Sequence, residues 1–111
     1  MNTLTSIVYA VTDLRAAKAI QTVLLGTDPH TDTPYYVGFN VGGVEIGLTP
    51  KDPKTATMVA YVHVPDLEAA LTEVLSAGAT LASKPHDVGG GTRIATVTDA
   101  DGNTLGLITR S

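Results

Sequence analysis

Two side chains on predicted strands, His63 and Glu45, are best suited to carry chemistry. His63 lies near the end of the β-branched run Met58 to Val64, where strand alternation puts it on the same face as Tyr61. An imidazole titrates near neutrality and can act as an acid or a base. Glu45 follows a Gly-Gly turn, and a carboxylate facing a partly apolar cleft can act as a base. We predict both as catalytic residues. Two alternatives stay open: a hydrogen-bonded wall role for His63, and a solvent position for Glu45 after one step of strand slip.

Other catalytic patterns are missing from the sequence. The three histidines show no H-x-x-x-H or H-x-E spacing, so His30 and His86 are predicted as surface residues and no metal site is predicted. The chain has no cysteine, which excludes thiolate chemistry, disulfides and cysteine-ligated metals. The three glycines 89–91 could form a flap over a cleft, but no helix start or lysine follows them, so they are not a phosphate loop. No Ser-His-Asp order or nucleophile elbow is present.

Length and charge limit the class of protein. At 111 residues the chain is expected to form a single domain, or two small modules that share a core. Seven basic and 11 acidic residues give a net charge of −4, which argues against nucleic acid or an anionic membrane as partner. No signal peptide and no apolar run of the ~20 residues that cross a bilayer are present. The sequence therefore predicts a cytoplasmic protein.

The first half of the chain reads as strand, helix and hairpin. A strand is predicted over 3–12, a helix over 14–25 with Asp13 as N-cap and Gly26 after its end, and strands over 35–41 and 44–49. We expect the helix to bury an apolar stripe, which consists of Ala16, Ala17, Ile20, Val23 and Leu24. Residues 51–57 contain two lysines and a proline without an apolar anchor, and are predicted as a linker between modules 1–50 and 58–111.

The second half repeats the first. A strand is predicted over 58–64, a helix over 67–77 capped by Asp66, a strand or edge segment over 80–86, and a hairpin over 92–110. Its helix is expected to bury Leu67, Ala70, Leu71, Val74 and Leu75. A shift of 53 residues superposes Val11 and Asp13 on Val64 and Asp66, and a shift of 59 superposes the G-x-x-φ-G-L hairpin at 43–48 on 102–107. The sequence therefore predicts an α+β fold of two tandem βαβββ modules with curved mixed sheets.

The sheet faces that point away from the helices are predicted to form a cleft. They carry a mixed set of small, apolar and polar residues, which suits a ligand site. The ligand-binding candidates are Ser6, Val8, Phe39, Val59, Tyr61, Arg93 and Ile108. Tyr36, Phe39 and Tyr61 could supply stacking surface or be ordinary core residues. Arg93 could hold an anionic group or form a surface ion pair.

The chain resembles the vicinal oxygen chelate superfamily, which includes glyoxalase I, the bleomycin-resistance proteins and the extradiol dioxygenases. The D-x-D-G-N word at 99–103 and the V-x-D-L word at 11–14, nearly repeated at 64–67, carry the resemblance. By the resemblance, metal ligands of this superfamily would fall at Ser6, Gly47, Val59 and Gly106, and only serine among these has a ligating side chain. The resemblance therefore implies the fold without the metal site, and no cofactor is predicted.

Two functions stay open at this point. One is a glyoxalase/bleomycin-resistance-like protein that binds a small, partly apolar molecule without chemistry. The other is a metal-independent isomerase, cyclase or lyase that uses His63 or Glu45 for proton transfer. A metal-dependent glyoxalase-type enzyme is a third, weaker interpretation. A homodimer is expected, since open sheet edges need covering.

Overall fold

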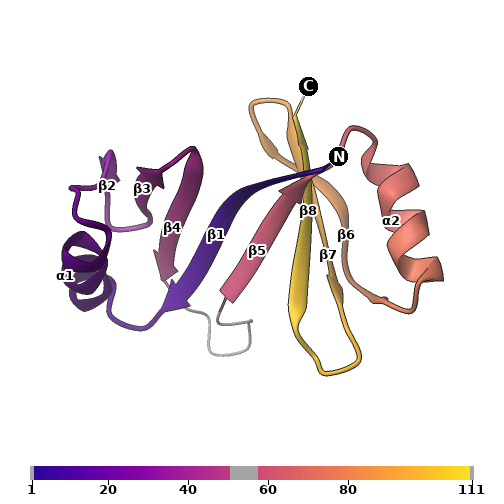
Figure 1. The fold of residues 1–111 in the computed structure, drawn as a ribbon, viewed down its shortest axis with the longest axis horizontal. Coiled ribbons are helices and arrows are strands. Elements are labelled where there is room, and N and C mark those ends of the chain that lie inside the picture. The colour runs from indigo at the N-terminus through magenta and orange to yellow at the C-terminus, as the bar shows by residue number, and fades with distance from the viewer. Residues whose placement is uncertain (1, 51–57, 111) are drawn as a thin grey trace. The chain divides into compact units, whose positions relative to one another are not determined.

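The α+β architecture with two βαβββ modules is confirmed. The computed structural model describes residues 2–50 and 58–110, so the predicted linker 51–57 lies outside the described residues. The first module consists of β1 (Thr3–Val11), α1 (Leu14–Leu25), β2 (Thr31–Asp32), β3 (Val37–Val41) and β4 (Val44–Pro50). The second consists of β5 (Met58–His63), α2 (Leu67–Ser76), β6 (Thr80–Gly89), β7 (Thr92–Thr98) and β8 (Thr104–Arg110) (Figure 1).

Each module forms a mixed sheet, as predicted. In the first, the strand order is β2-β3-β4-β1, with β1 parallel to β4 and the other pairs antiparallel. In the second, the order is β5-β8-β7-β6, with β5 parallel to β8. Contacts divide the chain into two compact units, Thr5–Val59 and Ala60–Ser111 with Met1–Leu4. The cleft expected between the modules stays a prediction.

Both helices begin at an aspartate that follows a strand. The Asp13 carboxylate accepts from the Ala16 amide at 3.0 Å, and the Asp66 carboxylate accepts from the Ala69 amide at 3.1 Å. Each bond satisfies one amide that has no partner within its own helix. The duplicated aspartate is therefore a structural signal. Among the described residues, neither helix is long and apolar enough to cross a bilayer.

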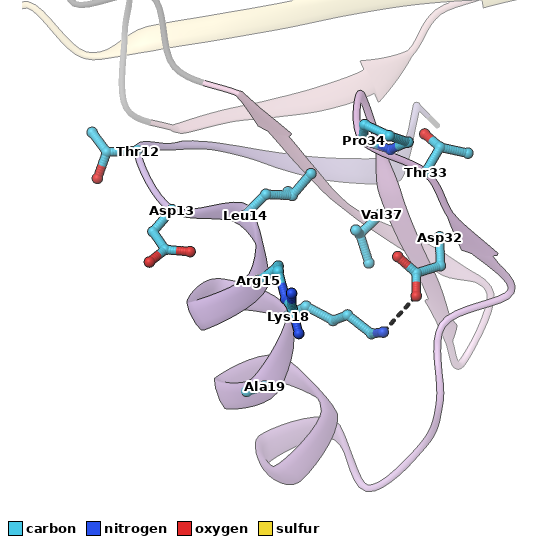
Figure 2. A pocket seen from close by; sticks show the side chains of 10 residues that line it. All are labelled: Thr12, Asp13, Leu14, Arg15, Lys18, Ala19, Asp32, Thr33, Pro34 and Val37. Carbon is cyan, nitrogen blue, oxygen red and sulfur yellow. Dashed lines mark hydrogen bonds and ion pairs between the residues drawn. The ribbon is translucent and has the colours of Figure 1, made fainter.

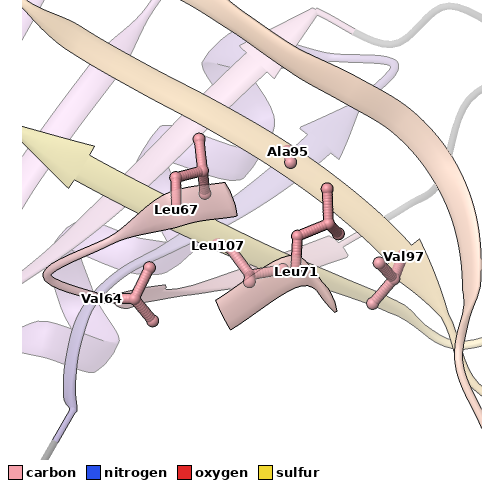
Figure 3. Packing of buried hydrophobic residues seen from close by; sticks show 6 residues of the cluster. All are labelled: Val64, Leu67, Leu71, Ala95, Val97 and Leu107. Carbon is pink, nitrogen blue, oxygen red and sulfur yellow. The ribbon is translucent and has the colours of Figure 1, made fainter. Parts of the chain in front are cut away.

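The second module has a core between α2 and its sheet. Leu67 and Leu71 of α2 pack against Ala95, Val97 and Leu107 of β7 and β8 (Figure 3). The predicted stripe of this helix is confirmed, because Ala70, Val74 and Leu75 also pack against the cluster.

The first module packs its helix on a different face from the one predicted. Val37, Phe39 and Leu48 form the buried cluster of this module. Leu14, Ala17 and Leu25 are the α1 residues that pack against it. Most of the predicted stripe is wrong: Ala16 is exposed, and Ile20, Val23 and Leu24 are 66%, 83% and 73% exposed. The helix has apolar residues on two faces, so periodicity alone could not choose between them.

The D-x-D-G-N word forms the turn between β7 and β8. The Asp99 carboxylate accepts from the amides of Asp101 and Asn103 at 3.0 and 2.9 Å, and from the Asn103 side chain at 3.0 Å. These bonds fold the turn around one carboxylate. In this protein the D-x-D-G-N motif, which carries the resemblance, therefore stabilises a turn.

Candidate functional site

The face of the first module that points away from α1 carries the best candidate site. Phe39 and Leu48 point into the helix-facing core. Their strand neighbours Gly38 and Gly47 therefore lie on the opposite face, where they pair directly across β3 and β4. Glu45 shares this face and pairs in register with Ser6 of β1. The structure thus places Glu45 on the same face as Gly38 and Gly47. The catalytic role of Glu45 stays a prediction.

Three polar side chains meet on this face. The Tyr36 hydroxyl lies 2.6 Å from Oε2 of Glu45, and Nε2 of His30 lies 2.8 and 2.9 Å from its two carboxylate oxygens. An ionised carboxylate only accepts, so both neighbours donate to it. Nδ1 of His30 lies 2.8 Å from the Thr31 hydroxyl oxygen, which fixes the other side of the ring. We call His30, Tyr36 and Glu45 the Glu45 cluster.

Gly38 and Gly47 must lack a side chain, because the side chains of the Glu45 cluster fill the space above them. A Cβ at residue 38 would lie 2.6 Å from both Glu45 Oε2 and Tyr36 Cε2, and 2.9 Å from His30 Cε1. A Cβ at residue 47 would lie 2.8 Å from Tyr36 Cε1. Cβ atoms essentially never approach other atoms so closely, so the Tyr36 ring rests on bare backbone.

Burial and the neighbouring carboxylate keep Tyr36 protonated. Partial burial raises the pKa of the Tyr36 phenol, and its hydrogen bond to Glu45 and the negative charge of that carboxylate raise it further. The neutral phenol is therefore a permanent donor at neutral pH.

The Glu45 cluster holds a carboxylate in a fixed position on a half-open face. The Glu45 side chain is 25% exposed, and two donors from the protein restrict its rotation. The remaining lone pairs can accept from a ligand hydroxyl or amine, or take a proton from a substrate. His30 was predicted as a surface histidine and Tyr36 as stacking surface or core, and neither was predicted as a partner of Glu45. The sequence feature that could have indicated this site is the pair of glycines at 38 and 47, because their small size leaves room for an aromatic ring.

The second module has a similar ring on a glycine. Tyr61 pairs in register with Gly106, and a Cβ at residue 106 would collide with the Tyr61 ring. Burial raises the pKa of the Tyr61 phenol. His63 is half-buried and pairs with Ile108, which is 7% exposed and lies outside the α2 cluster. Strand alternation places all four residues on the face away from α2. The proton-transfer role of His63 stays a prediction.

The other predicted ligand residues differ in burial and in the contacts that they make. Ser6 is buried, and Val8 and Val59 are half-buried. Phe39 is 0% exposed in the α1-facing core, so it does not line the opposite face. Arg93 pairs with Glu68 of α2 at 2.7 Å, which raises the pKa of the guanidinium and lowers that of the carboxyl. The structure therefore shows the core position and the surface ion pair that the sequence left open for these two residues.

A hollow of about 890 Å³ lies beside the start of α1 (Figure 2). It is lined by Thr12, Asp13, Leu14, Arg15, Lys18, Ala19, Asp32, Thr33, Pro34 and Val37. Asp13 is engaged as the helix cap, and Lys18 forms an ion pair with Asp32. With these groups engaged, we do not take the hollow as the functional site.

The positions that the resemblance assigns to metal ligands do not fit a metal ion. Gly47 and Gly106 lack side chains and are covered by tyrosine rings, and Val59 is apolar. Ser6 is the only one of the four with a donor side chain, and a lone neutral hydroxyl is a poor ligand set. In the part of the chain that the structure describes, no group of three or more His, Asp or Glu residues could hold a metal ion.

Sequence comparison connects these features to known proteins. Residues 3–107 match the family model described as Glyoxalase/Bleomycin resistance protein/Dioxygenase superfamily. No curated protein matches the sequence significantly.

Solved structures share the fold at low sequence identity. A chain described as NAD-dependent benzaldehyde dehydrogenase from Legionella pneumophila matches at TM-score 0.75 and 17% identity, covering 100% of both chains. Methylmalonyl-CoA epimerase from Mycobacterium tuberculosis matches at TM-score 0.73 and 20% identity, covering 98% of this chain and 88% of that one. A glyoxalase/bleomycin resistance protein/dioxygenase superfamily member from Vibrio splendidus 12B01 matches at TM-score 0.72 and 15% identity, covering 98% of both. These likenesses show the fold and do not select an activity.

Proposed function

The chain belongs to the glyoxalase/bleomycin resistance protein/dioxygenase superfamily, and on that premise we propose that it binds a small, partly apolar organic molecule on the sheet faces that carry Tyr36 and Tyr61. One observation carries the proposal: at Gly47 and Gly106, the two positions that the resemblance assigns to metal ligands, a tyrosine ring occupies the space that a side chain would need. The Tyr36 and Tyr61 rings, which lie over glycine backbone, present flat apolar surface to a ligand. Their hydroxyls add polar contacts.

A thermal-shift screen with small aromatic and antibiotic-like compounds tests the proposal. For any compound that raises Tm, we expect Tyr36→Leu and Tyr61→Leu to weaken binding by roughly 2- to 12-fold, since an aromatic contact contributes ~0.5–1.5 kcal/mol beyond its buried area. Arg93→Gln is the matched control, because Arg93 pairs with α2 on the other side of its sheet. Unchanged affinity in both tyrosine variants contradicts the proposal.

A second candidate function is metal-independent proton transfer, and the Glu45 cluster favours it. A carboxylate held by His30 and Tyr36 can remove a proton from a carbon next to a carbonyl and return it. His63, on the second module, is the other candidate acid or base.

Methylmalonyl-CoA is a suitable probe for this second function, since structural relatives include its epimerases. Proton transfer predicts deuterium incorporation at the acidic carbon in D₂O, measured by NMR, and its loss in Glu45→Gln with Arg93→Gln unaffected. Equal exchange in wild type and Glu45→Gln would show that Glu45 is not the base. A parallel His63→Ala variant tests the second candidate residue.

We also propose that the chain is a cytoplasmic single domain that acts as a homodimer. The edge strands of the two module sheets, β2 and β6, support this oligomeric state, because uncovered sheet edges favour association.

A further inference from the structure

The second-module face that points away from α2 carries bases without acids. Strand alternation and register place three basic side chains on it: His63 on β5, His86 on β6 and Arg110 on β8. Within residues 58–110, every carboxylate lies elsewhere: on or just before α2, on the α2-facing side of β6, or in the turn after β7. These residues are Asp66, Glu68, Glu73, Asp87, Asp99 and Asp101. The whole chain carries a net charge of −4, so the basic character of this face is local.

His63 and Arg110 are close enough to contact the same small anion. His63 pairs in register with Ile108 of β8, and Arg110 lies two residues further along that strand. With strands ~4.8 Å apart and a rise of ~3.3 Å per residue, the Cα atoms of His63 and Arg110 are about 8 Å apart. Arg110 also pairs in register with Thr92 of β7, whose hydroxyl is a further donor on this face.

Neither of these two basic side chains is engaged by the part of the chain that the structure describes. His63 forms no hydrogen bond there, and Arg110 forms neither a hydrogen bond nor an ion pair. His63 is half-buried, and no described side chain has a buried nitrogen or oxygen without a partner. The ring nitrogens of His63 therefore reach solvent. His86 differs, because its Nδ1 donates to the Lys84 carbonyl oxygen at 2.8 Å.

We propose that this face binds a carboxylate carried on a small apolar body, and that His63 and Arg110 hold the carboxylate. A guanidinium presents two parallel donors that match a carboxylate, and an imidazole adds a third. The Tyr61 ring and the half-buried Ile94 side chain share this face and supply apolar contact for the rest of the molecule. The inference rests on the proposed binding function and names the class of ligand that the second module takes.

The corresponding face of the first module has the opposite charge. It carries the Glu45 carboxylate, which is 25% exposed. Within residues 2–50, the lysine and arginine side chains belong to α1, namely Arg15 and Lys18, so neither lies on the face that carries Glu45. An ionised carboxylate repels another, so the charges assign an anionic ligand group to the second module.

Benzoate and benzamide are a matched pair of probes, because they have similar shapes and differ in charge. Chemical-shift titration of the isotope-labelled full chain measures a Kd for each. We expect benzoate to bind about two- to fivefold more tightly than benzamide, the effect of an exposed ion pair, and this preference to shrink between about 20 and 300 mM NaCl. Acetate and inorganic phosphate lack the apolar body and are expected to bind more weakly than benzoate.

Four variants locate the site. Arg110→Gln and His63→Gln are each expected to reduce the preference for benzoate over benzamide. Arg93→Gln removes the same charge as Arg110→Gln, but from the α2-facing side of the sheet. His86→Gln removes a histidine of the same face whose ring is held by a backbone carbonyl. Both controls are expected to keep the wild-type preference, and circular dichroism verifies that each variant is folded.

The possible results separate the ligand class from the proposed function. Equal affinity for benzoate and benzamide, weakened by Tyr61→Leu, overturns the carboxylate class and keeps the proposed function. Absence of benzoate binding also overturns the carboxylate class. Inorganic phosphate that binds as tightly as benzoate shows that the apolar body is not recognised, which overturns it as well. A preference for benzoate that neither His63→Gln nor Arg110→Gln reduces rejects this site.

Discussion

The ring of Tyr36 lies against Gly47, so close that a Cβ on residue 47 would be 2.8 Å from the ring atom Cε1. Gly47 is also the position where resemblance to the superfamily places a metal ligand in the first module. The same relationship recurs between Tyr61 and Gly106 in the second module. In both modules a tyrosine ring therefore fills the space that a side chain at the glycine position would need.

The contact between Tyr36 and Gly47 can be measured as a coupling energy. Gly47→Ala forces the ring away and is expected to destabilise the protein by about 1–3 kcal/mol, the usual cost of overpacking. The backbone at Gly47 does not have a positive φ, so an alanine is not strained there. In a Tyr36→Ala background we expect the cost to disappear, which urea unfolding of the four variants measures. An equal cost in both backgrounds would mean that the ring does not cause it.

The hydrogen bond from Tyr36 to Glu45 predicts a loss of stability at alkaline pH. The folded-state pKa of Tyr36 is raised above the unfolded value of about 10, so its contribution is complete below pH 10 and is lost as pH rises further. The free energy of unfolding should therefore fall more steeply above pH 10 in wild type than in Tyr36→Phe.

Tyr35→Phe is the matched control for that measurement. Tyr35 is the neighbouring residue, is 80% exposed and makes no hydrogen bond through its hydroxyl among the described contacts. Its variant should follow the wild-type curve. If Tyr36→Phe also follows it, the phenol is not held protonated by its surroundings.

The fold could be predicted because its signals are local and duplicated. Asp13 and Asp66 begin the two helices through bonds to amides three residues away, and Asp99 folds the last turn around its own carboxylate. Such contacts depend on sequence spacing alone. The prediction of the buried face of α1 was wrong because both sides of that helix carry apolar residues. Only the position of the sheet decides which side is covered.

The site could be predicted only in part. Strand alternation put Glu45 on the face away from α1, but His30 reaches Glu45 from a position 15 residues earlier, and no spacing rule joins them. The backbone amide of His30 donates to the Gly38 carbonyl, and this loop pairing brings the imidazole to the carboxylate. Arg93 and Phe39 were ambiguous in the sequence because their positions depend on which face of each sheet meets a helix.

Phe39 provides a test of the first-module core. Its side chain is 0% exposed among Val37, Leu48 and the inner face of α1, so Phe39→Ala should cost about 3–5 kcal/mol through lost burial and a cavity. Tyr35→Ala removes a similar ring from the surface and should cost within about 0.5 kcal/mol. Urea unfolding compares the two variants. A small cost at Phe39 would mean that its side chain contributes little to the first-module core.

The Asp99 turn predicts a dependence of stability on acid pH. The side-chain hydrogen bond from Asn103 lowers the pKa of the Asp99 carboxyl, and the amides of Asn103 and Asp101 lower it further. A lowered folded-state pKa adds stability above the unfolded value of about 3.9, and this stability is lost as pH falls through the folded value. Asp99→Ala should therefore reduce Tm at pH 6, and its difference from wild type should shrink below about pH 4. Asp101→Ala removes a carboxylate from the same turn but leaves the Asp99 carboxylate and its hydrogen bonds in place. This variant should change Tm little at either pH. A deficit in Asp99→Ala that is the same at pH 6 and pH 3 would mean that the turn does not depend on the ionised carboxylate.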